Sequence, residues 1–421
     1  MDLKFPKGFL FGSSTSSHQV EGYGNNDWTE WEQKNAKRLA LEAQTEMWPD
    51  FVLHSFPSPR DPENYISGIA CDHYHRFRED FDIVKDLGHN AHRFSIEWSR
   101  IEPEEGKFDE KEIEHYAQVI HALRERGMEP FVTLWHWTLP LWLRDLGGVE
   151  SKQFPEYFAR FYKKIVSSFK DDVTFYVTLN EPDVFTLNGY LRGIWPPQKK
   201  SIFVYYHISA NLIRAHRKAY NEIKRIQPSA QIGVVVSLTF FESAGGLINN
   251  IATWFLRYMR NHYFLNHIRS TQDFIGVNYY FHCYFDYGIV RKGFDRISDL
   301  GWQLFSRGMY YVLREAKKFN KPIYITENGL ADAQDKQRAW FVDEILKEVR
   351  CAMDEGVDVR GYFHWSLLDN FEWDKGFWPR FGLVEIDYQL KAGLPQAEKT
   401  LERKIRSSAW EYKKIIESSQ L

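Results

Sequence analysis

The stretch EYFARFYKKIVSSFKDDVTFYVTLNE, residues 156–181, contains one repeat of the pattern that decides the fold. Glu156–Phe169 places apolar side chains at helical spacing, which is typical of a helix with one buried face. Thr174–Leu179 is a short apolar run of strand length, and the polar pair Asn180 and Glu181 follows it directly. A helix followed by a strand whose end carries polar groups predicts one unit of an α/β fold.

The same alternation continues on both sides of this stretch. Seven further apolar runs are rich in Val, Ile, Phe or Tyr, as buried parallel strands are; they are Gly8–Ser13, Ala91–Ile96, Pro130–Leu134, Gln231–Leu238, Asp273–Val277, Pro322–Thr326 and Val359–His364. Amphipathic stretches that predict helices lie between them; they are Tyr74–Leu87, Lys111–Arg126, Val204–Ile226, Leu247–Ile268, Gly308–Phe319, Ala339–Met353 and Gln396–Ile416.

Eight such units without a break in composition predict an α/β chain folded as a single (β/α)8 TIM barrel over residues 1–421. In such barrels the active site lies at the C-terminal ends of the strands. A doubly wound open sheet is the structural alternative. It would more readily explain a glycine-rich phosphate loop after the first strand, and the sequence has none there.

Composition excludes several functional classes. Lys and Arg number 54 and Asp and Glu 57, so the net charge of −3 does not suggest a nucleic-acid binder. Aromatic residues make up 17%, which suits either a large core or stacking against sugar rings. The three cysteines are far apart and form no disulfide framework, and the N-terminus does not resemble a secretory signal, so we expect a cytoplasmic protein.

The aromatic segment Leu247–Ile268 leaves a second location open. It could lie on a membrane surface as an amphipathic helix, which would make the protein peripherally membrane-associated. A helix packed on the barrel explains the segment more simply.

Polar residues follow the predicted strands at the positions where a barrel places its active site. A charge at the end of an apolar run is expensive to bury without a purpose, so this pattern favours an enzyme over an inert scaffold. The residues concerned are Gln19, Glu21, Glu97, His136, Trp137, Asn180, Glu181, Asn278, Tyr279, Tyr280, Glu327, Asn328, Trp365, Asp369, Asn370, Glu372 and Trp373.

Glu181 and Glu327 follow the fourth and seventh strands and would therefore share one pocket. Two carboxylates in one pocket do not both ionise easily, so one is held as an acid while the other stays charged. Cleavage of a glycosidic bond needs such a pair. The alternative is that each glutamate caps a strand end or forms an ion pair with an arginine.

Several segments resemble the family-one retaining β-glycosidases, the β-glucosidase and β-galactosidase group, over nearly the whole chain. The resemblance is closest to short, archaeal-like members. It is carried by FLFGSSTSSHQVEG (9–22), NAHRFSIEWSR (90–100), TLNEP (178–182), ITENG (325–329) and GYFHWSLLDNFEW (361–373).

The resemblance implies a role for each matching residue. Glu181 matches the general acid/base and Glu327 the nucleophile. Four residues match those that orient the nucleophile or bind the sugar 2-hydroxyl: Arg93, Asn180, Asn278 and Tyr280. Five match the shell that reads the other hydroxyls: Gln19, His136, Trp137, Glu372 and Trp373. Trp365 matches the platform under the sugar ring, with a core tryptophan as the alternative.

The function implied is hydrolysis, by double displacement, of terminal non-reducing β-D-glucosyl residues from aryl or alkyl glycosides and short oligosaccharides. Galactosyl, fucosyl and mannosyl substrates stay open, as does the oligomeric state. The expected partner is the small-molecule β-glycoside alone, with no metal or cofactor; we interpret the run at 72–75 as structural.

Two other functions share the fold. A phospho-β-glycosidase is disfavoured because Glu372 would repel a phosphate. A non-catalytic sugar-binding relative typically lacks one of the two carboxylates, and both are present.

The segment after the fifth strand is shorter than is usual for this family and reads WFLRYMRNHYFLNHIRSTQDFIG over residues 254–276. The apolar character of Leu247–Phe264 predicts an apolar entrance to the site. Such an entrance would favour alkyl or aryl glucosides over long oligosaccharides.

Overall fold

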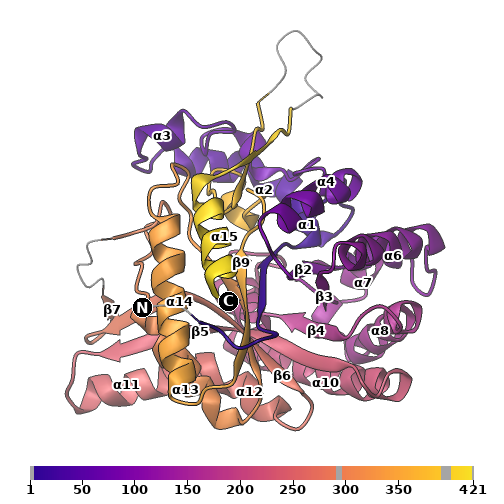
Figure 1. The fold of residues 1–421 in the computed structure, drawn as a ribbon. Helices are drawn as coiled ribbons and strands as arrows, with labels where there is room; N and C mark the ends of the chain where they lie inside the picture. The colour runs from indigo at the N-terminus through magenta and orange to yellow at the C-terminus, as the bar shows by residue number, and fades with distance from the viewer. Residues whose placement is uncertain (1–3, 291–295, 390–399, 420–421) are drawn as a thin grey trace.

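The computed structural model describes residues 4–290, 296–389 and 400–419, and eight of its strands form a closed parallel barrel (Figure 1). β1 pairs with both β2 and β9, and β5 pairs with both β4 and β6, so the sheet has no open edge within the barrel. The predicted (β/α)8 barrel is confirmed. The strands are β1 (Leu10–Ser14), β2 (Ala91–Ser95), β3 (Glu129–Thr133), β4 (Phe175–Asn180), β5 (Gln231–Ser243), β6 (Phe274–Phe285), β8 (Ile323–Asn328) and β9 (Val359–Trp365).

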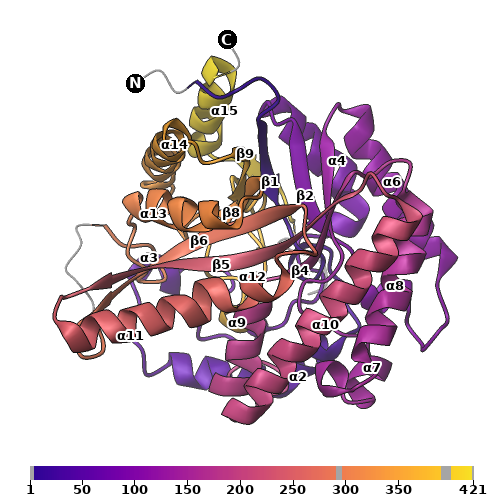
Figure 2. The same cartoon turned by 90° about the horizontal axis from the view of Figure 1, so that it is seen from below.

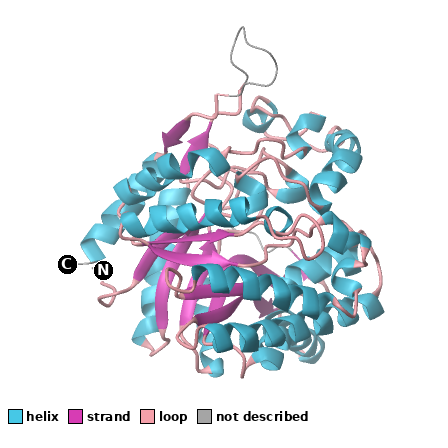
Figure 3. Cartoon of the chain, turned by 90° about the vertical axis from the view of Figure 1, so that its right-hand side faces the viewer, coloured by secondary structure: helices cyan, strands magenta, loops and turns pink. Residues whose placement is uncertain are grey.

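Helices surround this barrel, as Figure 3 shows. Each buries an apolar face on the strands because its apolar residues recur at helical spacing. The main helices are α4 (His73–Asp86), α6 (Glu110–Glu125), α8 (Phe154–Phe169), α10 (Ile202–Ile226), α13 (Arg307–Ala316), α14 (Arg338–Asp354) and α15 (Ser407–Ser419).

Aromatic side chains fill the interior of the barrel. Phe131 on β3 stacks on Phe175 at 4.3 Å between ring centroids, and it also contacts Phe274, Tyr324 and Phe363 from other strands. Side chains of this size leave the interior packed, as expected of a barrel with eight strands. An open space for a ligand is therefore found beyond this layer.

β5 and β6 run further than the sequence predicted. Their outer parts pair Thr239–Ser243 with Phe281–Phe285, and β7 (Ile289–Val290) pairs antiparallel with β6. This ribbon projects from the barrel with α11 (Leu247–Arg257) lying along it (Figure 2). The prediction ended both strands where their purely apolar runs end.

The predicted helix Leu247–Ile268 consists of three pieces: α11, a π-helical turn η4 (Tyr258–His262), and α12 (Tyr263–Ile268). α11 buries Asn249 and Thr253. The expectation that the segment packs on the barrel is confirmed for α12, which buries Phe264, Leu265 and Ile268. It is wrong for α11, in which five apolar residues are exposed: Leu247, Ile248, Ile251, Trp254 and Phe255. Within the described ranges, no helix combines the length and apolar composition that crossing a bilayer requires.

The last predicted helix, Gln396–Ile416, begins too early. Residues 396–399 lie outside the described residues, and β11 (Arg403–Ile405) pairs antiparallel with β10 (Val384–Ile386) before α15 begins at Ser407. The extended backbone lets Arg403 reach Asp80 with its guanidinium, a long-range contact that no local pattern reports.

The sequence reading also missed a helix, α2 (Asp27–Ala43). Its start carries a clear local signal. The side chain of Asn26 accepts from the backbone N–H of Thr29 at 3.0 Å, and the Thr29 hydroxyl oxygen accepts from the N–H of Asn26 at 2.9 Å. This reciprocal arrangement is a capping box.

Candidate active site

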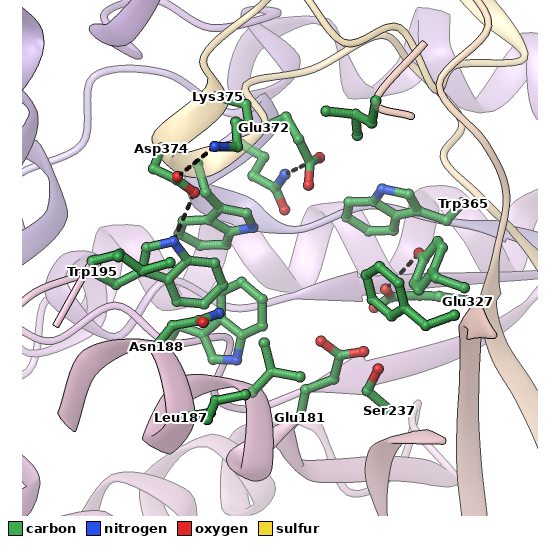
Figure 4. A pocket seen from close by; sticks show the side chains of 18 of the residues that line it. Glu181, Leu187, Asn188, Trp195, Ser237, Glu327, Trp365, Glu372, Asp374 and Lys375 are labelled. Carbon is green, nitrogen blue, oxygen red and sulfur yellow. Dashed lines mark hydrogen bonds and ion pairs between the residues drawn. The ribbon is translucent and has the colours of Figure 1, made fainter. Parts of the chain in front are cut away.

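A cavity of about 340 Å³ opens at the C-terminal ends of the barrel strands (Figure 4). Glu181 and Glu327 both face it. Seven other residues of the predicted site line it as well: Gln19, His136, Trp137, Tyr280, Trp365, Glu372 and Trp373.

The barrel strands are irregular where they end beside this cavity. The pairing register shifts between Val177 and Asn180 on β4, at Asn278 on β6, and before Asn328 on β8. Such irregularities re-aim side chains, and they are common beside active sites.

Three residues at the cavity adopt the left-handed backbone conformation although none is glycine: Trp137 (φ 80°), Glu181 (φ 42°) and Trp373 (φ 50°). This conformation is costly for a residue with a side chain and tends to persist at functional sites. Glu181 holds it at the corner between β4 and α9 (Pro182–Thr186).

Glu327 lies between a cation and a hydroxyl. Arg93 Nη1 donates to Glu327 Oε1 at 2.5 Å, and the Tyr280 hydroxyl donates to Oε2 at 3.0 Å. Arg93 is fully buried and also donates to Asn180 Oδ1 at 2.7 Å, which fixes its orientation. The ionised form of Glu327 is therefore stabilised by a charge and by hydrogen bonding.

Glu181 has a neutral donor instead. Asn278 Nδ2 donates to Glu181 Oε1 at 2.8 Å, while Asn278 Oδ1 accepts from the Thr326 hydroxyl at 2.8 Å. The second bond fixes which end of the amide faces the glutamate. Asn278 thus contacts Glu181 through its amide nitrogen, and hydrogen bonding from Asn278 also favours the ionised form of Glu327.

These surroundings separate the two carboxyl groups. Burial raises the pKa of Glu181 well above its usual range, and the charges of Glu327 and Asp183 raise it further. Burial also raises the pKa of Glu327, but Arg93 and the hydroxyl of Tyr280 oppose the rise. At neutral pH, Glu181 is therefore the group that keeps its proton.

A second polar cluster lies across the cavity. Gln19 Nε2 donates to Asn370 Oδ1 at 3.0 Å and to Glu372 Oε2 at 3.3 Å, and the Ser16 hydroxyl donates to Gln19 Oε1 at 2.7 Å. Burial, followed by the charge of Glu327, raises the pKa of Glu372 to about 8. The cluster offers donors and acceptors whose positions are fixed by other hydrogen bonds.

Aromatic rings form the walls between these clusters. The rings of Trp137 and Trp373 contact each other with their centroids 4.6 Å apart, and the ring of Trp195 packs on Trp137 with a centroid distance of 4.7 Å. Trp365 packs with Ala331 and Phe381 while it also faces the cavity. Rings with hydrogen-bonding groups at their edges suit a ligand that has both flat apolar faces and hydroxyls.

The sequence model of glycosyl hydrolase family 1 matches residues 1–264 and 261–421, which together span the chain. The chain belongs to glycosyl hydrolase family 1. Enzymes of this family are retaining glycosidases, and this chain is a retaining β-glycosidase; the two alternative functions are not favoured.

Relatives and solved structures agree with the family. The chain is 32% identical to a 1,4-beta-D-glucan glucohydrolase of Thermotoga neapolitana and 32% identical to beta-glucosidase A of Thermotoga maritima, in each case over 99% of both chains. A beta-glycosidase structure from Pyrococcus horikoshii matches with a TM-score of 0.86 at 35% identity over 100% of this chain and 96% of the other. The expectation of a short, archaeal-like member is thereby confirmed.

Three predicted residues of this family-1 glycosidase lie behind the cavity wall. Arg93, Asn180 and Asn278 are fully buried and reach the cavity through their partners. Asn180, for example, donates to His136 Nε2 at 3.0 Å, and burial together with Arg93 lowers the pKa of His136 well below its usual range, so that ring is neutral.

The sequence reading missed most of the outer wall. Asp374 and Lys375 directly follow two predicted residues, so their position was a signal that could have found them. The other missed residues are Val184, Leu187, Asn188, Arg192, Ile194, Trp195, Ser237, Arg260, Phe281, Leu300, Trp302 and Phe381.

The predicted apolar entrance is built from other residues than expected. Within Leu247–Phe264, a segment that the structure describes in full, only Arg260 lines the cavity. α11 itself runs along the projecting ribbon (Figure 2), and none of its apolar residues lines the cavity. The apolar part of the outer wall comes from the β4–α10 and β6–α13 connections, with Leu187, Ile194 and Trp302 among its members.

Proposed function

We propose that Glu327 is the nucleophile and Glu181 the general acid and base in a double-displacement hydrolysis of β-glycosides. The asymmetry between two buried carboxylates on one cavity supports this assignment best. Arg93 and Tyr280 donate to Glu327, whereas Glu181 accepts from the neutral amide of Asn278. The first environment favours a charged nucleophile and the second a protonated acid.

In the first step, Glu327 attacks the anomeric carbon, the bond to the aglycone oxygen breaks, and Glu181 gives that oxygen its proton. The product is a glycosyl ester of Glu327. The ester carries no charge, so the pKa of Glu181 falls, and its carboxylate can now take a proton from water. That water attacks the anomeric carbon, releases Glu327 and restores the β configuration.

We propose that the two polar clusters bind the hydroxyl groups of the sugar. Arg93, Asn180, Asn278 and Tyr280 lie on the side of the carboxylates and would orient Glu327 and the 2-hydroxyl. The other cluster and the rings would bind the remaining hydroxyls and the sugar face; its members are Gln19, His136, Trp137, Trp365, Glu372 and Trp373.

The substrate class proposed is terminal non-reducing β-D-glucosyl residues, with galactosyl, fucosyl and mannosyl residues as alternatives. The names of the relatives, glucan glucohydrolase and beta-glucosidase, support glucose. The apolar outer wall supports aryl and alkyl aglycones and short oligosaccharides. A Thermotoga maritima beta-glucosidase whose structure resembles this chain, with a TM-score of 0.83, was solved in complex with an N-octyl calystegine derivative.

Replacement of the two glutamates in turn tests the roles. Glu327→Gly should lower kcat by about 10⁴-fold or more, because the covalent step is lost. Added azide should restore turnover of a nitrophenyl β-glucoside and give the α-glucosyl azide, whereas Glu181→Ala with azide should give the β-glucosyl azide. NMR of the product anomer distinguishes these outcomes.

Glu411→Ala, on the exposed side of α15, is the control and should leave hydrolysis unchanged. Hydrolysis that survives in Glu327→Gly without azide would contradict the assignment of the nucleophile. The same azide anomer from both variants would contradict the division of roles.

We further propose that residues 1–421 form one domain and that the enzyme acts in the cytoplasm. Pairing of the first barrel strand, β1, with the last, β9, supports a single domain. Three cysteines without disulfide bonds, Cys71, Cys283 and Cys351, suit a reducing compartment.

A further inference from the structure

An ion pair that the proposed mechanism does not use borders the acid. Asp183, in the first turn of α9, lies two residues after Glu181 and pairs with Arg260 at 2.9 Å between Oδ2 and Nη1. The two side chains are 6% and 18% exposed. Arg260 also lines the active-site cavity together with Glu181 and Ser237. The pair therefore lies next to Glu181 in the chain, and its arginine lines the same cavity.

The position of Arg260 is fixed by the strand beneath it. Arg260 belongs to the π-helical turn η4, and the next residue, Asn261, anchors that turn to β5. The backbone N–H of Thr239 donates to Asn261 Oδ1 at 3.0 Å, and Asn261 Nδ2 donates to the Thr239 carbonyl at 2.9 Å. π-helical turns inside α-helices are frequent at functional sites.

The corner that carries Glu181 rests on the same strand. The backbone N–H of Glu181 donates to the carbonyl of Val235 on β5 at 2.9 Å. Glu181 itself is held in the left-handed conformation, which needs support from its surroundings. The ion pair between Asp183 and Arg260 links the corner to the turn η4, which Asn261 anchors to β5, and so gives the corner a second connection to that strand.

The pair also acts on Glu181 electrostatically. Burial is the main reason that the pKa of Glu181 is raised; Glu327 and Asp183 add to the rise, and Arg260 opposes it. A buried ion pair costs desolvation energy, and apolar residues of similar size often stabilise a fold equally well. Fold stability alone therefore does not account for a charged pair at this place.

We propose that Arg260 is a positioning residue for the reaction: through Asp183 it holds the β4–α9 corner so that the carboxyl of Glu181 meets the departing oxygen. This role rests on the proposed function, in which Glu181 is the acid. Acid assistance matters most for a poor leaving group. Loss of the ion pair should therefore lower kcat/KM more for a phenyl β-glucoside than for a 2,4-dinitrophenyl β-glucoside, whose leaving group needs less help from an acid.

The test compares kcat/KM for these two substrates, which have similar shapes, in Arg260→Gln and Asp183→Asn. We expect each variant to lose about tenfold or more on the phenyl glucoside and less than about threefold on the dinitrophenyl glucoside, since general acid catalysis contributes about 10²–10⁴-fold. Arg307→Gln removes an arginine from a part-buried pair with Glu348, at 2.6 Å, outside the cavity. Arg307→Gln should leave kcat/KM unchanged for both substrates.

Equal losses on both substrates, or no loss on either, would overturn the positioning role. Glu181→Ala is the reference. If it lacks the selective loss, the proposed acid is wrong; if it shows that loss while the Arg260 and Asp183 variants do not, only the role of Arg260 fails. Thermal unfolding checks each variant, and Asp183→Asn carries the test if Arg260→Gln does not fold.

Discussion

Asn278 and Tyr280, both on β6, donate hydrogen bonds to the two carboxylates at the cavity. The two residues are separated by one position on β6, where the pairing of the strand is irregular, and both side chains reach the carboxylates. The amide of Asn278 reaches Glu181, and the hydroxyl of Tyr280 reaches Glu327. Tyr279, between them, points the other way and donates to the carbonyl of Phe305 at 2.7 Å.

Replacement of Tyr280 by Phe removes one of the donors that hold the pKa of Glu327 down. The pKa of Glu327 should therefore rise, and the acid limb of kcat/KM should move to higher pH, because attack needs the ionised form. A hydrogen bond to a charged group is worth about 1.5–3 kcal/mol, which predicts a loss of about ten- to a hundredfold in kcat/KM. A pH profile with a nitrophenyl β-glucoside measures both effects.

Tyr279→Phe is the matched control on the same strand. It also removes a hydroxyl, but one that bonds away from the cavity, so the acid limb should stay in place. An acid limb that is unmoved in Tyr280→Phe, or equally moved in both variants, would contradict the assignment of Glu327.

At the scale of elements, apolar side chains of α11 are exposed outside the cavity, whereas Leu187 in the π-helical segment after α9 lines it. α11 runs along the ribbon of β5 and β6 (Figure 2), and its exposed side chains Ile251 and Trp254 do not line the cavity. Leu187, in the short π-helical segment after α9, lines the cavity on the side of Glu181 (Figure 4). Of these side chains, only Leu187 is placed to contact an aglycone.

We therefore expect Leu187→Ser to lower kcat/KM for octyl glucoside relative to cellobiose, and Trp254→Ser to leave that ratio unchanged. Loss of contact with one or two methylene groups costs about 1 kcal/mol, or about fivefold. Steady-state kinetics on the two substrates gives the ratio. If Trp254→Ser changes the ratio of kcat/KM for octyl glucoside and cellobiose while Leu187→Ser does not, the apolar entrance lies at α11, as the sequence predicted.

At the scale of the whole molecule, buried ion pairs fasten the C-terminal segment to the barrel. Arg403 binds Asp80 on α4, and Arg406 binds Asp369 after β9, each at 2.8 Å. Burial alone would raise the pKa of both carboxyls. Hydrogen bonds with His73 and Arg403 outweigh it at Asp80, and Arg406 outweighs it at Asp369, so the pKa of each lies below the usual range.

Asp369→Asn should lower the free energy of unfolding by about 3–5 kcal/mol, because it leaves the guanidinium of Arg406 buried without its counter-charge. The stabilisation is present above the unfolded pKa of about 3.9 and is lost as the pH falls through the lower folded value. Denaturant unfolding at pH 7 and below pH 4 measures the free energy of unfolding of the variant and of the wild type. Acidification should lower this free energy less in the variant than in the wild type. Asp354→Asn, in an exposed pair with Arg350, should change little.

The barrel and the two carboxylates could be read from the sequence. Each of the eight predicted apolar runs forms a barrel strand, because a strand buried on both faces needs a continuous apolar run. The closure of parallel strands then brings their C-terminal ends together, so residues such as Glu181 and Glu327, far apart in the chain, meet at one cavity.

The tertiary structure alone decided the remaining features, because they depend on contacts between distant segments. The extended backbone at Arg403 follows from its bond to Asp80, and the apolar face of α11 is exposed because the polar Asn249 and Thr253 pack inward. The place of Arg260 at the cavity is set by a π-helical turn anchored to β5. Apolar periodicity tells which residues avoid water; it does not tell which distant charge or strand a side chain will meet.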